Sequence, residues 1–180
     1  MKLVIGHSWV RRLKELDVCD DDFDFLCKGG ASYASMLNEV KCYFRSPSKV
    51  RPSFIFVFLG SNDLDNVPDI ASVHSVENQC SLFREVLRTL CPQAKIIVAQ
   101  VEDRYSFGHN EDKRAILCRF KAKSNKFNKW LNKFNGKDGL FVLKGQKSFS
   151  DPTLYARDGI HLNYDGNMKL ACRLNTFVAK

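Results

Sequence analysis

The strongest constraint on the fold is a regular alternation of short apolar runs with longer segments of helical periodicity. The runs at 54–59 and 95–101 consist almost entirely of β-branched, aromatic and other apolar residues, as strands buried on both faces require. The five runs are Leu3–Ile5, Phe25–Cys27, Phe54–Leu59, Lys95–Val101 and Leu140–Leu143. Because strands alternating with helices build βαβ units, the pattern predicts an α/β fold with a five-stranded, mostly parallel sheet and helices on both faces.

Two segments between these runs have apolar residues spaced by three or four, which is typical of amphipathic helices, and a last helix is expected near the C-terminus. They cover about residues 71–90, 116–134 and 164–178. Pro92 and Gly136 follow the first two segments and are expected to end them. In the second segment the lysines and arginines between the apolar residues are expected to face outward.

Length and composition favour a single globular domain over residues 1–180. The chain is 44% hydrophobic and 27% charged, which is ordinary for such a domain. No segment approaches the roughly 18 consecutive apolar residues of a transmembrane helix, so no membrane span is expected. The N-terminal segment lacks a long apolar stretch and a small-residue cleavage site, so we also expect no secretory signal.

The cysteines and histidines predict neither a disulfide framework nor a metal site. Seven cysteines are present, and no two have the C-x-x-C spacing. Free thiols in the cytoplasm or nucleus are the expected state. The four histidines form no H-E-x-x-H pair, so neither a metal nor another cofactor is expected.

Positive charge is concentrated between Lys113 and Lys137, within a net charge of +8. Such a bias is compatible with an anionic partner, either nucleic acid or anionic lipid, and equally with a solvated helix face. Six basic residues are expected on the exposed side of their helix, away from the strand ends: Lys113, Arg114, Lys121, Lys126, Lys129 and Lys133.

Glycine and small polar residues follow each of the first three predicted strands. These blocks are Gly6–Ser8, Gly29–Ser32 and Gly60–Asp63. In an open α/β sheet the ligand crevice lies beyond the carboxyl ends of the strands, so the three blocks are expected to converge there.

Ser8 and His161 are the candidate nucleophile and base. Ser8 precedes a helical segment, Trp9–Leu16, so its hydroxyl and N–H are expected at a helix N-terminus, where developing negative charge is stabilised. His161 could take the hydroxyl proton, and Asp158 could orient the ring and stabilise the imidazolium. Two alternatives stay open: Ser8 could simply cap the helix, and Asp158 could cap a turn beside a solvated histidine.

Asn62 and Gly30 are the candidate partners for an oxyanion. The Asn62 side chain and the Gly30 N–H could each donate a hydrogen bond to a carbonyl oxygen that gains charge. Asn62 could equally form an Asx-turn. Each feature is weak alone, but together they occur in the order that one acyl-transfer site requires.

The chain resembles the SGNH hydrolase superfamily, also called GDSL-like. The blocks ending at Ser8, Ser32, Asp63 and His161 resemble that family's Gly-Asp-Ser, glycine, Gly-x-Asn-Asp and Asp-x-x-His blocks. The resemblance implies a three-layer flavodoxin-like fold with strand order 2-1-3-4-5. It also implies Ser8 as nucleophile, His161 as base and Asp158 as the orienting acid. The oxyanion donors would be the N–H groups of Ser8 and Gly30 and the Asn62 side chain.

These features predict a serine esterase of the carboxylesterase or acetylesterase type, which cleaves short-chain acyl esters through an acyl-enzyme on Ser8. The chain departs from the family at His7, where aspartate is usual. A weak or inactive relative that binds an anionic partner through its basic helix is therefore an alternative. A nucleotide-binding flavodoxin-like domain is another, although the chain lacks a P-loop or G-x-G-x-x-G motif. A looser similarity, in Gly6–Leu13, is to esterase-like domains of animal retroelements.

Overall fold

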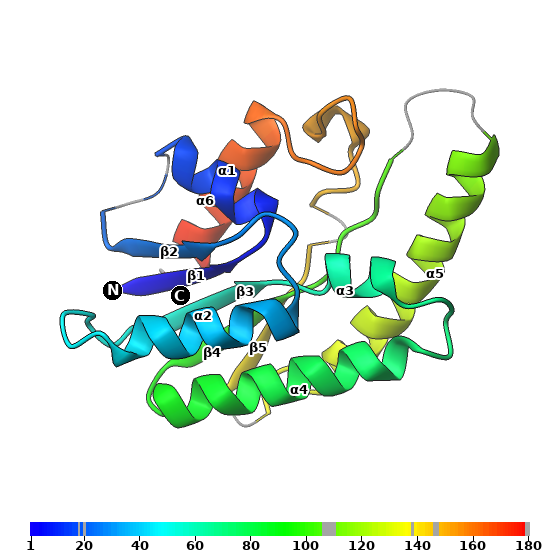
Figure 1. Ribbon diagram of the computed structural model, residues 1–180. Helices are drawn as coiled ribbons and strands as arrows, with labels where there is room; N and C mark the ends of the chain where they lie inside the picture. The colour runs from blue at the N-terminus through cyan, green and yellow to red at the C-terminus, as the bar shows by residue number, and fades with distance from the viewer. Residues whose placement is uncertain (18, 20, 106–110, 138, 146–147, 179–180) are drawn as a thin grey trace.

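A computed structural model of the chain describes residues 1–17, 19, 21–105, 111–137, 139–145 and 148–178. A five-stranded sheet forms its centre (Figure 1). The strands are β1 (Lys2–Gly6), β2 (Phe23–Cys27), β3 (Phe54–Phe58), β4 (Lys95–Ala99) and β5 (Leu140–Leu143). They pair in the order β2-β1-β3-β4-β5, and every pairing is parallel. The predicted α/β fold and strand order are confirmed.

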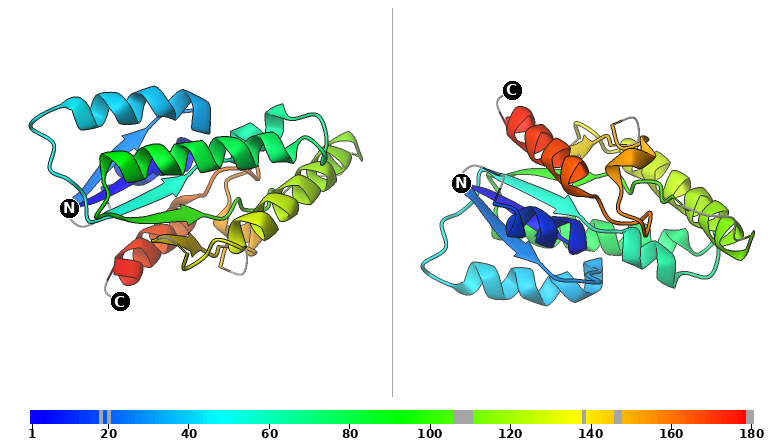
Figure 2. Two further views of the ribbon diagram at one scale, coloured as in Figure 1. Left: turned by 90° about the horizontal axis from the view of Figure 1, so that it is seen from below. Right: turned by 90° about the horizontal axis from the view of Figure 1, so that it is seen from above.

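Helices cover both faces of the sheet (Figures 1 and 2). The helices are α1 (Ser8–Glu15), α2 (Tyr33–Arg45), α3 (Ser61–Asn66), α4 (Val73–Leu90), α5 (Glu111–Asn132) and α6 (Tyr164–Val178), with a 3₁₀ turn at Pro152–Leu154. Helices α1 and α6 pack on one face, and α2, α4 and α5 pack on the other. The helices predicted at about 71–90, 116–134 and 164–178 correspond to α4, α5 and α6, whereas α2 and α3 were not predicted.

The sheet has a hydrophobic core on each of its two faces, and side chains that alternate along the strands contribute to both. Along β3, Ile55 and Val57 belong to the core under α2, α4 and α5, while Phe56 and Phe58 belong to the core under α1 and α6. Successive strand side chains point to opposite faces, so an unbroken apolar strand supplies two cores at once. This explains why these runs carry so few polar residues.

The prediction for the second amphipathic segment is wrong at two positions. Ile116, assigned to its apolar stripe, is 56% exposed. Lys123, expected to face outward, is buried, and its Nζ donates to the Val67 carbonyl at 2.9 Å. A long lysine side chain can bury its methylene stem while its amine reaches a polar partner, which is how Lys123 lies in the core.

Gly6 sets the sharp turn from β1 into α1. A Cβ at this position would lie 2.5 Å from Val10 Cγ2 and 2.8 Å from the Phe58 carbonyl oxygen. Only glycine fits between the strand and the helix at this separation. Ser8 therefore emerges directly at the carboxyl end of the central strands.

No helix in the described ranges has the length and apolarity needed to cross a bilayer.

Candidate active site

The cap of α1 is His7, so Ser8 does not have the capping role considered from the sequence. The Nδ1 atom of His7 accepts a hydrogen bond from the Trp9 backbone N–H at 3.3 Å. Ser8 is the first residue of the helix, and its N–H has no partner within the helix. Its hydroxyl is free to bond elsewhere, and it contacts His161.

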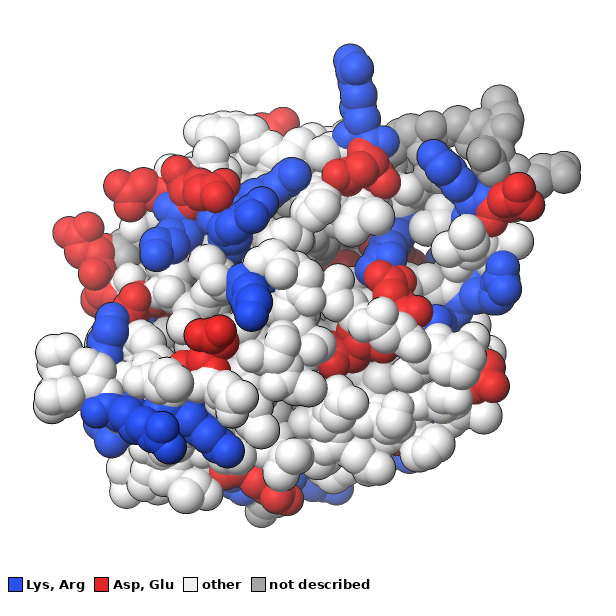
Figure 3. All heavy atoms as spheres, in the orientation of Figure 1, with Lys and Arg blue, Asp and Glu red and all other residues white. Residues whose placement is uncertain are grey.

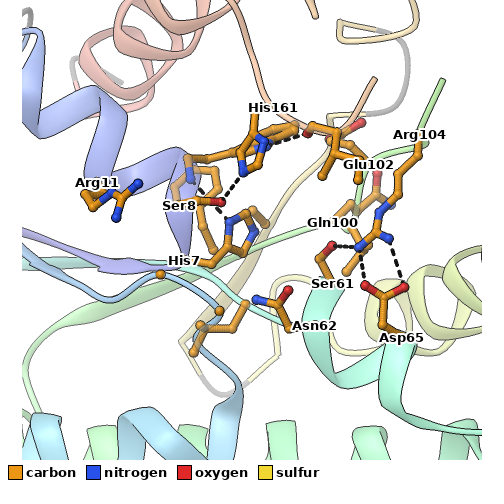
Figure 4. A pocket seen from close by; sticks show the side chains of 18 of the residues that line it. His7, Ser8, Arg11, Ser61, Asn62, Asp65, Gln100, Glu102, Arg104 and His161 are labelled. Carbon is orange, nitrogen blue, oxygen red and sulfur yellow. Dashed lines mark hydrogen bonds and ion pairs between the residues drawn. The ribbon is translucent and has the colours of Figure 1, made fainter. Parts of the chain in front are cut away.

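His161 lies beside Ser8 although the two residues are 153 positions apart in the chain (Figure 4). The distance from His161 Nε2 to Ser8 Oγ is 2.9 Å, and that from His161 Nδ1 to Asp158 Oδ2 is 2.7 Å. The structure thus brings the three predicted residues into one hydrogen-bonded line. This is the arrangement needed to pass a proton from a serine hydroxyl to an imidazole held by a carboxylate.

Asp158 both closes a turn and holds the ring of His161. Its Oδ1 accepts from the backbone N–H groups of Ile160 and His161, each at 2.9 Å. Burial alone would raise the pKa of Asp158, but hydrogen bonds from the His161 backbone and ring and from Ile160 lower it to about 2. The carboxyl is therefore ionised at neutral pH, so it accepts the Nδ1–H of His161. This leaves Nε2 as the acceptor for the Ser8 proton.

The loop that carries His161 is anchored on two sides. Trp9 Nε1 donates to the Ile160 carbonyl at 2.9 Å, which ties the loop to α1. The Tyr105 N–H donates to the Gly159 carbonyl at 2.8 Å. Gly159 has a φ of +69°, and a Cβ there would lie 1.7 Å from the Tyr105 carbonyl oxygen, so only glycine fits.

The candidate oxyanion donors line the same pocket as Ser8. Asn62 lies in the first turn of α3, and its Nδ2 donates to the Ala31 carbonyl at 2.8 Å. One N–H of the amide remains for a ligand. Gly30 has a φ of +69°, a conformation that glycine adopts without strain, and no described residue accepts from its N–H.

Asp63, the last residue of the Gly60–Asp63 block, is hydrogen-bonded to the residue that follows the Gly29–Ser32 block. Its carboxylate accepts from the Tyr33 N–H at the start of α2, at 3.1 and 3.4 Å. Burial is the largest influence on its pKa and raises it to about 6, against the lowering effect of hydrogen bonds from Tyr33 and Gly60. Asn62 and Asp63 therefore hold the Gly30 loop in place together.

The pocket has a volume of about 410 Å³ and a polar wall that was not predicted from the sequence. Arg104 forms a bidentate ion pair with Asp65 at 2.8 and 2.7 Å, donates to Ser61 Oγ at 2.8 Å, and stacks on Phe120 with 3.9 Å to the ring centroid (Figure 4). The rule that pointed to the first three strand ends, applied to the fourth, would have indicated residues 100–104.

Glu102 is a second unpredicted residue of this wall. Its Oε2 is buried with no hydrogen-bond partner. The pKa of Glu102 is raised to about 8, mainly by burial; the charge of Arg173 opposes this shift and that of Asp103 adds to it. Glu102 is therefore mostly protonated at neutral pH.

Ionisation of Glu102 makes the stability of the wild-type protein fall as pH rises. Below its ordinary pKa of 4.5, Glu102 is protonated in both folded and unfolded states; between 4.5 and about 8 only the unfolded state loses the proton. We expect Glu102→Gln to unfold with a higher free energy than wild type at pH 8, by on the order of a few kcal/mol, and with no difference near pH 4.5. Urea unfolding across this pH range measures the difference in unfolding free energy.

Glu85→Gln, which changes an exposed carboxyl, is the control and should show no such trend. Equal stabilities of Glu102→Gln and wild type at every pH would contradict the prediction.

The six basic residues predicted to be exposed are exposed; five lie on α5, and Lys133 directly follows its last residue. They are not all separate from the pocket, because Lys121 pairs at 3.2 Å with Asp103, which lines it. Lys126 donates to the Ile70 carbonyl at 2.7 Å. On the face shown in Figure 3, acidic and basic side chains are interspersed in the region of α5, so this view shows no uniformly positive surface.

Within the described ranges, no three His, Cys, Asp or Glu side chains are placed to hold a metal ion, and no disulfide joins two cysteines. His109 lies outside those ranges.

Comparisons by sequence find no match, either to a family model or to a curated protein. Solved structures do match. A Streptococcus pneumonia protein, provisionally described as a platelet activating factor, is 19% identical with a TM-score of 0.79, over 98% of this chain and 83% of that one. An acetyl esterase mutant with acetate ion is 13% identical with a TM-score of 0.67, over 99% and 96%. A member of the lipolytic G-D-S-L family from Veillonella parvula DSM 2008 is 14% identical with a TM-score of 0.65, over 98% and 97%.

These likenesses concern the fold, over nearly the whole of this chain. They give no support to the looser similarity to retroelement esterase domains, which stays a prediction. The chain has the α/β fold of the SGNH (GDSL) esterases and lipases, with an all-parallel sheet of five strands.

Proposed function

We propose that this protein is a serine esterase that hydrolyses short-chain acyl esters, with acetyl esters as its best substrates. The observation that carries the proposal is the line of hydrogen bonds from Ser8 Oγ through His161 to Asp158, at 2.9 and 2.7 Å. Binding of a nucleotide or of an anionic polymer would not need this arrangement. Acyl transfer needs it, because a serine hydroxyl is a weak nucleophile until a base takes its proton.

In the first half of the reaction Ser8 Oγ attacks the ester carbonyl carbon while its proton moves to His161 Nε2. The carbonyl oxygen becomes an oxyanion, for which the N–H groups of Ser8 and Gly30 and the Asn62 amide are the donors. His161, now positively charged, is stabilised by the ionised Asp158. It then protonates the leaving alcohol, and the acyl group remains on Ser8.

In the second half a water molecule takes the place of the alcohol. His161 removes a proton from the water, which attacks the acyl carbon, and the same donors stabilise the second oxyanion. Collapse releases the acid and returns the proton to Ser8. A pocket of about 410 Å³ is near the small end of the usual range for ligand sites, which favours a short acyl group.

The test is a series of p-nitrophenyl esters from acetate to octanoate, supplied to the purified protein. The proposal expects turnover that is fastest with the acetate ester and falls as the acyl chain lengthens. A protein that hydrolyses none of the series would instead favour the non-catalytic alternative. In that case, salt-dependent binding to duplex DNA or anionic vesicles would support a role for the exposed α5 side chains.

Asn62→Ala is expected to lower kcat by roughly 10²–10³ and to change KM much less, because its amide is proposed to bind charge that appears only in the transition state. The variant also loses the hydrogen bond to the Ala31 carbonyl. Thermal unfolding is therefore measured beside the kinetics. An increase in KM with unchanged kcat would make Asn62 a ground-state contact instead.

A further inference from the structure

The mechanism above gives no task to the ring of His7, the residue that replaces the usual aspartate of the resembled family. The ring lines the pocket, and Figure 4 shows it projected between Ser8 and Asn62. These are two of the residues that would surround the oxyanion. The ring therefore lies where a bound ester would contact it.

The helix cap determines which nitrogen of the neutral ring carries the proton. The Trp9 N–H, which can only donate, bonds to His7 Nδ1 at 3.3 Å. Nδ1 must therefore be unprotonated, and the proton lies on Nε2. No described residue forms a hydrogen bond with Nε2, so its N–H is available to a molecule in the pocket.

The surroundings of His7 also keep the ring uncharged. Burial, and then the positive charge of Arg104 and a smaller electrostatic contribution from His161, lower the pKa of His7 to about 4. Arg104 is itself paired with Asp65. A neutral imidazole donor adds no cation beside His161, which must itself become positively charged during the reaction. A neutral histidine with a lowered pKa can polarise a carbonyl group in this way.

We propose that His7 is an additional donor of the oxyanion site, whose Nε2–H bonds the carbonyl oxygen of the ester as Ser8 attacks. The proposal rests on the esterase function proposed above. Asn62 uses one amide N–H on the Ala31 carbonyl and has only one left for the oxyanion, so a further N–H beside it strengthens the site. An ionised aspartate at position 7 would only accept hydrogen bonds and could not do this.

Two variants separate the donor from the cap. In His7→Asn, Oδ1 can still accept from the Trp9 N–H, but the side chain is too short to place a donor where Nε2 lies. In His7→Gln, an amide N–H reaches that position, while the cap of α1 is weakened.

We expect His7→Asn to fold normally and to lose kcat by roughly 10- to 100-fold, with KM within about twofold. His7→Gln should melt at a lower temperature yet have the higher kcat of the two. Wild-type kcat in His7→Asn, or a kcat in His7→Gln no higher than in His7→Asn, would overturn the proposal.

A second measurement needs no turnover and uses Ser8→Ala with acetate as the probe. Nitrogen-15 NMR of the ring should show Nε2 protonated and Nδ1 unprotonated at neutral pH, and added acetate should move the His7 Nε2 proton downfield. An Nδ1–H tautomer, or no shift of that proton at any acetate concentration, would contradict the proposal. If wild type shows no Ser8-dependent turnover, the esterase function fails, and this titration still judges His7 separately.

Discussion

Ser8→Ala is expected to fold like wild type and to lose nearly all esterase activity, by about 10⁴-fold or more in kcat. The hydroxyl is the proposed nucleophile, and no other described residue bonds His161 Nε2. The fold should survive because the cap of α1 is the His7 side chain, not Ser8. The assay is turnover of p-nitrophenyl acetate, with thermal unfolding measured in parallel.

Ser48→Ala is the matched control, since Ser48 is exposed in the loop between α2 and β3 and does not line the pocket. It should keep wild-type activity. A folded Ser8→Ala protein that hydrolyses the ester at the wild-type rate would exclude the serine mechanism.

Asp158→Asn is expected to cost roughly 10³–10⁴-fold in kcat while leaving the loop intact. The asparagine Oδ1 can still accept from the Ile160 and His161 N–H groups. Its NH₂ group, however, would donate to His161 Nδ1, which places the ring proton on Nε2. A ring protonated on Nε2 cannot take the Ser8 proton. In the described structure no backbone carbonyl bonds Nδ1 to share the role of Asp158.

Asp151→Asn tests whether such a loss is specific. Asp151 caps the Pro152–Leu154 turn through Thr153 much as Asp158 caps its own turn, but among the described residues no hydrogen bond or ion pair joins it to His161. Its variant should keep wild-type kcat. Loss of less than about tenfold in Asp158→Asn would show that the carboxylate is mainly a turn residue.

Much of the sheet was predictable, as was the position of the polar blocks at the strand ends, because the signals are local. Buried parallel strands need unbroken apolar runs, and each polar block follows its strand directly in the chain. Helix α2 was missed although Met36, Val40 and Phe44 lie on its buried side. Its capping box joins Ser32 to Ser35, whereas the usual sequence signature ends in glutamate or glutamine.

The remaining features depend on contacts between distant parts of the chain. Serine is a strong helix cap, so the local sequence favoured Ser8 for that role; only the folded chain brings His161 to its hydroxyl. Arg104 meets Asp65 across 39 positions, and Lys123 reaches a carbonyl 56 positions away. No local spacing encodes such pairs. The same holds for Glu102, whose burial depends on Gly145 packing against its carboxyl.

The most direct test of the central claim is mass spectrometry of the protein quenched in acid within milliseconds of mixing with p-nitrophenyl acetate. The account predicts a species heavier by one acetyl group, with the group located on Ser8 by peptide fragmentation and absent from Ser8→Ala. Turnover of the ester with no acetylated protein at any time, or with the acetyl group on another residue, would contradict it.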